Sequence, residues 1–285
     1  MNATRIVLAA GALALASGTA QSASHGGAPG KIKFDLSGHI HVAYVNADDG
    51  QNSEHFITDG SSSGSRLRVK GSGSIGGGLT AGGALEFGIT ALDTSGAVTL
   101  AARDPGAGGI SFRHTYVYFG GGFGTVTIGQ TDGAADGTTE HEFTGTGLAN
   151  GYSRVDHGGS IAYQNNGVST GITLGSAFAT LDFEGRHNLI RYVSPKFGGG
   201  MTIGASYGHK NGVDVFDLGF NGSFKFAAGD LKIGLGYSDQ DVAGDDTHTG
   251  FSAAFKMKSG FNIAGRYATR DAGGRDRTSS GILVG

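Results

Sequence analysis

The sequence of 285 residues contains no cysteine, no tryptophan and only three prolines. Without cysteine, the chain can form neither disulfides nor zinc sites with thiolate ligands. Beyond residue 20 it also lacks an apolar run of the roughly 20 residues that a membrane-spanning helix needs. The formal net charge is −3, which argues against nucleic acid as a partner.

The first 20 residues have the pattern of an export signal. Arg5 precedes the apolar run Ile6–Ala16, and small residues follow up to Ala20. The alternative is a retained anchor, for which the run is too short to cross a bilayer as a helix. We therefore expect residues 1–20 to be a signal peptide and residues 21–285 to form one mature domain.

Glycine is abundant, with 56 residues, but it has no three-residue period, which excludes a collagen-like chain. The 17 Phe and 9 Tyr argue against disorder. A weak, floppy domain is the remaining alternative, and regular alternation around the glycines disfavours it. The composition instead suits a sheet with one apolar and one polar face.

Alternation of apolar and polar residues is the main structural signal. In the strand predicted at 31–44, Ile32, Phe34 and Leu36 fall on an apolar face. In the strand predicted at 65–75, Arg66, Arg68 and Lys70 fall together on the polar face. Three cations on one strand face suit a wet interior or a solvated sheet and do not suit a packed core. A soluble sandwich would also alternate, so the strands alone leave both folds open.

The connections between strands distinguish the two folds. Short and long connections alternate along the chain. The short ones are glycine-rich turns, as at 76–78, 120–122 and 165–167, and the long ones include 46–64 and 92–109. Transmembrane barrels have short periplasmic turns and longer external loops, whereas sandwiches do not sort their loops in this way. The sequence predicts an all-β, transmembrane antiparallel β-barrel of about fourteen strands, closed by pairing of its first and last strands. It would have sixteen if weak strands lie within the long loops.

Three segments resemble a known family: SRLRVKGSGSIGGGL, RHTYVYFGGGFGTVTIGQ and NLIRYVSPKFGGGMTIGASYG. They look like the general porins of Gram-negative bacteria. The third segment carries the family's N-x-x-R-Y-x-S-P-x-F pattern at Asn188, Arg191, Tyr192, Ser194, Pro195 and Phe197. The chain departs from the family in its strand count and in ending without a C-terminal aromatic residue, from which we expect that a few residues are missing.

This resemblance implies an outer-membrane homotrimer of water-filled barrels in a Gram-negative bacterium, passing small hydrophilic solutes and ions. It also implies that the loop at 131–158 folds inward and narrows the channel. The candidate constriction acids are Asp132, Asp136, Glu140 and Glu142, and the candidate basic wall is Lys33, Arg66, Arg68, Lys70 and Arg113. The side of Arg113 stays open, because the period is blurred after it. The alternative for the loop is a solvated segment that splays outward.

His39 and His41 share the polar face, about 7 Å apart at two-residue spacing. A metal pair or a pH gate is one interpretation, and wet histidines without a role are the favoured one, since the spacing supplies no third ligand. Acidic clusters at 46–64 and 240–246 do not have EF-hand spacing. We expect no metal and no cofactor, and these mouth acids predict a weak cation preference, opposed by the basic wall.

The sequence disfavours two other classes of function. An outer-membrane barrel enzyme would need a Ser/His or His/Asp site, and the chain has no G-x-S-x-G elbow, so no enzyme is expected. A non-porous structural or adhesion barrel would need a filled interior, whereas the polar face of this chain is thinned by glycine. The sequence therefore favours a porin surrounded by outer-membrane lipid.

Overall fold

A computed structural model describes residues 9–11, 32–100, 108–145, 156–177, 182–242, 246–273 and 276–285. The part before the long polar loop contains β1 (Ala9–Gly11), β2 (Lys33–His39), β3 (Val42–Asp48), β4 (Ser53–Asp59), β5 (Arg66–Gly76), β6 (Leu79–Thr90), β7 (Gly109–Gly121) and β8 (Gly124–Thr131). The part after it contains β9 (Ala162–Asn165), β10 (Val168–Thr173), α2 (Leu174–Ala177), β11 (His187–Val193), β12 (Met201–Lys210), β13 (Val213–Lys225), β14 (Gly229–Gln240), β15 (Asp246–Met257), β16 (Asn262–Ala272) and β17 (Asp276–Val284).

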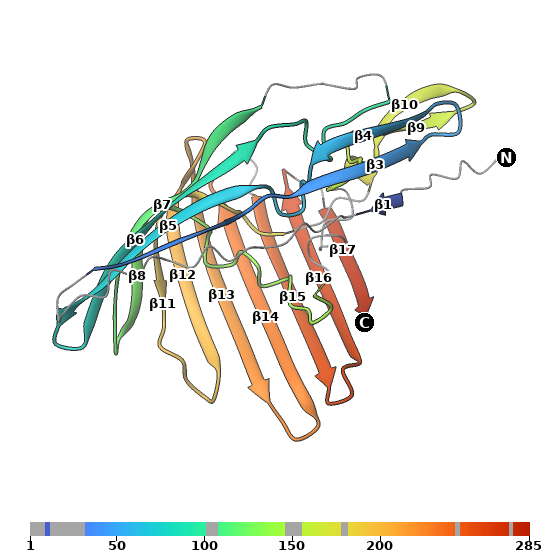
Figure 1. The fold of residues 1–285 in the computed structure, drawn as a ribbon. Helices are drawn as coiled ribbons and strands as arrows, with labels where there is room; N and C mark the ends of the chain where they lie inside the picture. The colour runs from blue at the N-terminus through green and yellow to red at the C-terminus, as the bar shows by residue number, and fades with distance from the viewer. Residues whose placement is uncertain are drawn as a thin grey trace.

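Twelve of these strands form one antiparallel sheet in the order β17-β16-β15-β14-β13-β12-β11-β8-β7-β6-β5-β2. Figure 1 shows this sheet, with β11 to β17 side by side and β5 to β8 continuing it. Within the described residues, β2 and β17 are its end strands and no ladder pairs them. Closure into a barrel, which the sequence predicts, is therefore not seen as a first-to-last pairing and stays a prediction.

The described strands differ from the predicted ones near the N-terminus in two ways. The single strand predicted at 31–44 is interrupted at Ile40–His41, and its two halves are β2 and β3. Within the predicted loop 46–64 lies β4, which pairs with β3, while β2 pairs with β5. Sixteen strands follow β1, in place of the fourteen counted from the sequence.

The β9–β10 hairpin does not lie in the wall, in contrast to the prediction. β8 pairs directly with β11, from Thr131 opposite His187 to Thr125 opposite Val193, so residues 132–186 are one long connection. A Cβ added at Gly167, in the β9–β10 turn, would lie 3.3 Å from Oε1 of Gln51 in the β3–β4 turn. The predicted periplasmic turn at 165–167 thus lies beside a predicted external turn. Local alternation gave no information about which strands pair.

The two faces of the large sheet differ as the alternation predicts. One face, the apolar face, exposes large side chains on every long strand, including Leu67, Leu85, Val117, Ile190, Ile203, Leu218, Leu235, Phe251 and Ile263. Among the described residues, no helix is both long enough and apolar enough to cross a membrane.

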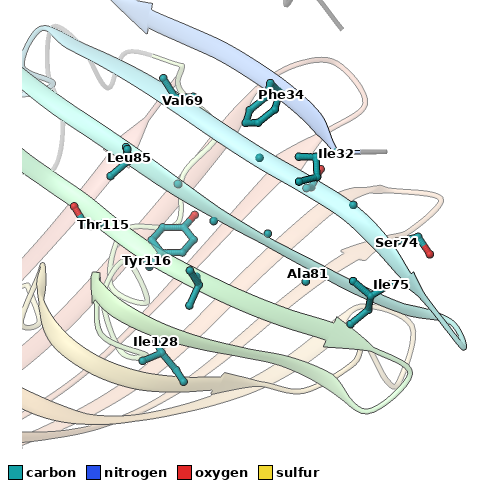
Figure 2. A pocket seen from close by; sticks show the side chains of 17 residues that line it. Ile32, Phe34, Val69, Ser74, Ile75, Ala81, Leu85, Thr115, Tyr116 and Ile128 are labelled. Atoms are coloured by element: carbon teal, nitrogen blue, oxygen red, sulfur yellow. The ribbon is translucent and has the colours of Figure 1, made fainter. Parts of the chain in front are cut away.

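A shallow groove of about 750 Å³ crosses the apolar face of β2 and β5 to β8. Figure 2 shows Phe34, Val69, Leu85 and Ile128 around it. The opposite face, the polar face, carries charged and hydroxyl side chains.

A small hydrophobic core lies where β3, β4 and β9 meet. Val45, Phe56, Val98, Ile161 and Leu174 are buried together there. Figure 1 shows the β3–β4 and β9–β10 hairpins gathered at one end of the molecule. The described parts of several connections therefore form one packed unit.

Candidate functional site: a charged wall and an apposed loop on the polar face

The basic wall predicted from the sequence is organised around one carboxylate, Glu86 of β6, which is fully buried. Arg68 of β5 lies directly opposite it in the ladder and makes a short ion pair with it. The Nη1 of Arg66 lies 3.6 Å from its Oε1, and the Nε of Arg113 donates a 2.7 Å hydrogen bond to the same oxygen. Three guanidinium groups thus share one negative charge.

A bulge in β7 settles the side of Arg113. In the β6–β7 ladder Glu86 pairs with His114 and Phe87 pairs with Phe112, which leaves Arg113 without an opposite residue. The extra residue lets Arg113 and His114 both reach the polar face. The alternation in the sequence does not reveal this extra residue, so it could not decide the side of Arg113.

The two predicted wall lysines stand apart from this cluster. Lys33 and Lys70 are exposed, toward the glycine-turn end of β2 and β5, where Lys70 is opposite Asp35 in the ladder. The structure therefore brings together three of the five predicted basic residues. It adds Glu86, which the sequence placed on the polar face without assigning it a role.

The described part of the long loop, residues 132–145, lies along the polar face of the sheet. The Nη1 of Arg191 in β11 donates to the Asp132 carbonyl at 2.9 Å. The Ala134 amide donates to Oγ of Ser206 in β12 at 2.8 Å. Further along, Oγ of Ser252 in β15 donates to the Thr138 carbonyl at 2.6 Å. The loop thus crosses from β11 to β15 and is tied to the sheet by its backbone.

The far end of this loop is held by two lysines. The Nζ of Lys232 in β14 donates to the Glu142 carbonyl at 3.0 Å and lies 4.5 Å from the ring centroid of Phe143. The Nζ of Lys256 in β15 lies 5.1 Å from the same centroid. An ammonium within about 6 Å of a ring face is attracted by the ring quadrupole, so Phe143 is clasped from two strands.

The four candidate acids of the loop have different environments. Asp132 faces the basic wall, with its carboxylate 3.9 Å from Nη1 of Arg186 and 3.7 Å from Nε2 of His114. Burial, reinforced by Asp132, raises the pKa of Asp136 to about 8. Burial, reinforced by Asp182, likewise raises the pKa of Glu140 to about 8. Glu142 accepts a hydrogen bond from the Thr144 amide at 3.1 Å.

A second segment, residues 182–186, packs against the loop and was not singled out from the sequence. Oγ1 of Thr139 donates to Oδ1 of Asp182 at 3.2 Å, and burial raises the pKa of Asp182. The ring of Phe183 stacks on His248 of β15 with centroids 4.2 Å apart. Two segments far apart in sequence therefore occupy the polar face together.

Glu184 in this second segment joins three strands by charge. It forms a short ion pair with Lys210 of β12, lies 3.6 Å from Nη2 of Arg270 in β16, and accepts a 2.8 Å hydrogen bond from Nε2 of Gln240 in β14. The polar face thus carries two charged clusters, one around Glu86 on β5 to β7 and one around Glu184 against β12, β14 and β16.

The two histidines singled out in the sequence lie near the β3–β4 end of the wall. Nε2 of His39 and Nδ1 of His41 are each 3.1 Å from the Ser63 carbonyl oxygen. His41 also packs edge-on against His157, with centroids 6.4 Å apart. Among the residues that the structure describes, no three His, Cys, Asp or Glu side chains are grouped to hold a metal ion.

A broad antiparallel sheet with an apolar face, a charged opposite face and a long loop on that face has the architecture of transmembrane β-sheet proteins of the outer membrane. The family profile of the Gram-negative porins matches residues 9–285. The chain belongs to the Gram-negative porin family, as its sequence segments predict.

Individual relatives are more distant. Outer membrane porin protein 32 of Delftia acidovorans is 28% identical over 230 residues, which cover 78% of this chain and 58% of that protein. The chain thus spans 58% of the length of this curated relative. An anion-selective porin from Comamonas acidovorans is similar in structure, with a TM-score of 0.46, 20% identity and coverage of 89% of this chain and 83% of that one. The loop L8 deletion mutant of OmpT, an outer membrane protein of Vibrio cholerae, is similar with a TM-score of 0.48 and 12% identity. The match covers 90% of this chain and 88% of that one.

Two expectations fall outside the described residues. One is the signal peptide at 1–20, of which only Ala9–Gly11 is described, as β1 paired with β3. The other is the part of the loop at 146–155, which includes Arg154.

Proposed function

We propose that this protein is an outer-membrane channel for passive diffusion of small hydrophilic solutes and ions, and that the loop at 131–158 is its constriction. The observation that carries the proposal is the course of residues 132–145 over the polar face of β11 to β15. A loop in that position occupies cross-section inside a barrel and faces the arginines around Glu86. An outward-splayed loop would make none of these hydrogen bonds.

We further propose a preference for anions. Three guanidinium groups surround the single carboxylate Glu86, so the wall carries an excess of positive charge. Of the opposing loop acids, Asp136 and Glu140 have pKa values raised to about 8 by burial and are mostly protonated at neutral pH. Charges lining a narrow pore set its ion selectivity. This reverses the weak cation preference expected from the mouth acids.

The assembly that we propose is a homotrimer embedded in outer-membrane lipid. The exposed apolar face supports contact with lipid or with another subunit. Sedimentation of the detergent-solubilised protein, with the detergent contribution matched out, measures the mass of the assembly. A monomeric mass would contradict this part of the proposal.

Deletion of residues 133–145 tests the channel and its constriction together. In planar bilayers the wild type is expected to conduct, and the deletion variant is expected to show a higher single-channel conductance and to admit larger sugars in liposome swelling. Removal of Gly50 and Gln51, at the tip of the β3–β4 turn, is a control that shortens a different connection. Equal conductance of folded wild type and loop-deleted protein would reject the constriction.

A further inference from the structure

Four glycines lie in one row across the polar face of the sheet. In the ladders Gly204 of β12 is directly opposite Gly219 of β13, Gly219 is opposite Gly236 of β14, and Gly236 is opposite Gly250 of β15. We call these four residues the glycine row. Its strands are neighbours about 4.8 Å apart, so the row runs roughly 14 Å across the wall.

The row lies beneath the apposed loop. A Cβ added at Gly219 would overlap the Ala134 carbonyl oxygen. One at Gly236 would overlap both the Thr138 hydroxyl and the Phe183 ring. At Gly250 it would stand 2.6 Å from Cγ2 of Thr139, and at Gly204 it would stand 3.3 Å from Cβ of Ala134. Each step along the row thus meets successive residues of loop segment 134–139.

The loop itself is built from small residues where it meets the row. Residues 134–139 are Ala-Ala-Asp-Gly-Thr-Thr, and Thr138 and Thr139 are fully buried between loop and wall. Ser206 and Ser252 lie two residues along from Gly204 and Gly250. Ser206 accepts a hydrogen bond from the Ala134 amide and Ser252 donates one to the Thr138 carbonyl, which fixes the loop at both ends of the row. The small residues of the loop therefore pack directly on the backbone of four strands.

Glycine inside a strand weakens it by roughly 0.5–1 kcal/mol relative to alanine, so four in register need a compensating contact. Widening of the channel is one explanation, but an added methyl would strike the loop at these positions and would not project into open space. Gly265 of β16 lies on the apolar face, in line with Ile263 and Tyr267, and an added Cβ there would come no closer than 4.0 Å to another residue. A methyl group at Gly265 therefore adds volume to the sheet without touching the loop. Close approach of the loop is the explanation that the contacts support.

We propose that the glycine row is a seat that sets how far the constriction loop stands out from the wall, and so determines the size limit of the channel. This inference rests on the proposed channel function. It makes Gly219 and Gly236 specificity-determining positions although neither contacts the solute. Any side chain there would lift residues 134–139 toward the channel axis.

The seat is tested independently of conductance by a disulfide. The chain has no cysteine, so a pair at Ala134→Cys and Gly204→Cys is unambiguous. The 3.3 Å between the two Cβ positions is close to the spacing that a disulfide requires. We expect this pair to cross-link in folded protein after mild oxidation, and the pair Ala134→Cys with Gly265→Cys not to. Absence of the first cross-link would overturn the seat.

The size limit is tested with the double variant Gly219→Ala/Gly236→Ala. We expect a roughly twofold lower conductance and slower entry of the larger sugars, because the loop narrows the pore. Gly265→Ala is the matched control and should conduct like the wild type. If the double variant fails to fold, Gly250→Ala, which has the smaller overlap, should show the same direction of change. Wild-type conductance in a folded row variant would overturn the proposal. If the Ala134→Cys/Gly204→Cys variant forms the cross-link but the wild type never conducts, the channel function is refuted and the seat is not.

Discussion

Arg113 reaches Glu86 from a bulged position in β7, and its Nε donates to Oε1 of that carboxylate at 2.7 Å. The bulge is what adds a third guanidinium to the pair that β5 already supplies from Arg66 and Arg68. A regular β7 would turn either Arg113 or His114 toward the apolar face. The charge of the wall therefore depends on one irregularity in one strand.

Glu86→Gln should increase anion preference, because three guanidinium groups then lose their shared counter-charge. The reversal potential in asymmetric salt is expected to shift further toward that of the anion. Leaving buried charges without their partner should also destabilise the protein by about 3 kcal/mol. Asp48→Asn, which removes one carboxylate at the β3–β4 turn, is the control, and an equal shift in both variants would show that the effect is only one of net charge.

Selectivity should depend on pH above neutrality. Burial raises the pKa of Asp136 and Glu140 to about 8, above their ordinary values. The folded loop thus holds more protons than an unfolded one between about pH 4 and pH 8. The free energy that holds the loop against the wall therefore decreases as pH rises through that window, and it stays constant above it. The lumen also gains negative charge near pH 8, and anion preference should fall between pH 7 and pH 9.

The double variant Asp136→Asn/Glu140→Gln is the control for this titration. It cannot ionise at these two positions, so its reversal potential should change much less over the same pH range. The same pH dependence in the wild type and in this variant would assign the titration to other groups.

Phe143→Leu should loosen the end of the constriction loop without removing its seat. The clasp by Lys232 and Lys256 contributes about 0.5–2 kcal/mol through cation–π attraction, and leucine keeps the volume without the ring quadrupole. Hydrogen exchange of the amides at 142–145 is expected to accelerate, with more open-channel noise. Phe226→Leu, an exposed phenylalanine of the β13–β14 turn, serves as the control. Unchanged exchange in the first variant would mean that the backbone hydrogen bond from Lys232 suffices.

The position of the β9–β10 turn can be tested by labelling. Because Gly167 lies beside Gln51, cysteines at Asn166 and Gln51 should both react with an impermeant maleimide on intact cells. A cysteine at Gly122, in the β7–β8 turn, should react only after lysis. Labelling at Gly122 but not at Gln51 on intact cells would reverse the orientation of the sheet.

Alternation and turn residues predicted most of the wall, because those signals are local. From β11 to β17 the predicted and observed strands agree within a few residues, and Asn211 and Gly212 turn β12 into β13 with positive φ values of 53° and 82°. The sequence Ser53–Asp59 resembles a polar loop, so β4 was missed. This segment forms a strand because it pairs with β3, and the local sequence does not indicate that pairing.

The site was less predictable, because its properties come from contacts between distant segments. The acidic residues of the loop and the basic residues of the wall can be recognised in the sequence, but their contacts cannot. The position of Glu86 among three arginines depends on ladder register, and the protonation of Glu140 depends on Asp182, 42 positions further along. Nothing in the sequence distinguishes the four glycines of the row from the many others in this chain. Their role depends on their register in the sheet and on the loop that packs over them.

The direct pairing of β8 with β11 also bears on how the wall assembles. Thr131 and His187 are opposite each other although 56 positions separate them, whereas the adjoining pairs β7–β8 and β11–β12 are joined by short turns. Closing so long a segment costs chain entropy before any ladder hydrogen bond forms, which slows folding relative to hairpin formation. The strands β5 to β8 and β11 to β17 are thus expected to form as two hairpin-built blocks, and their junction beneath the constriction loop to be the rate-limiting step of assembly.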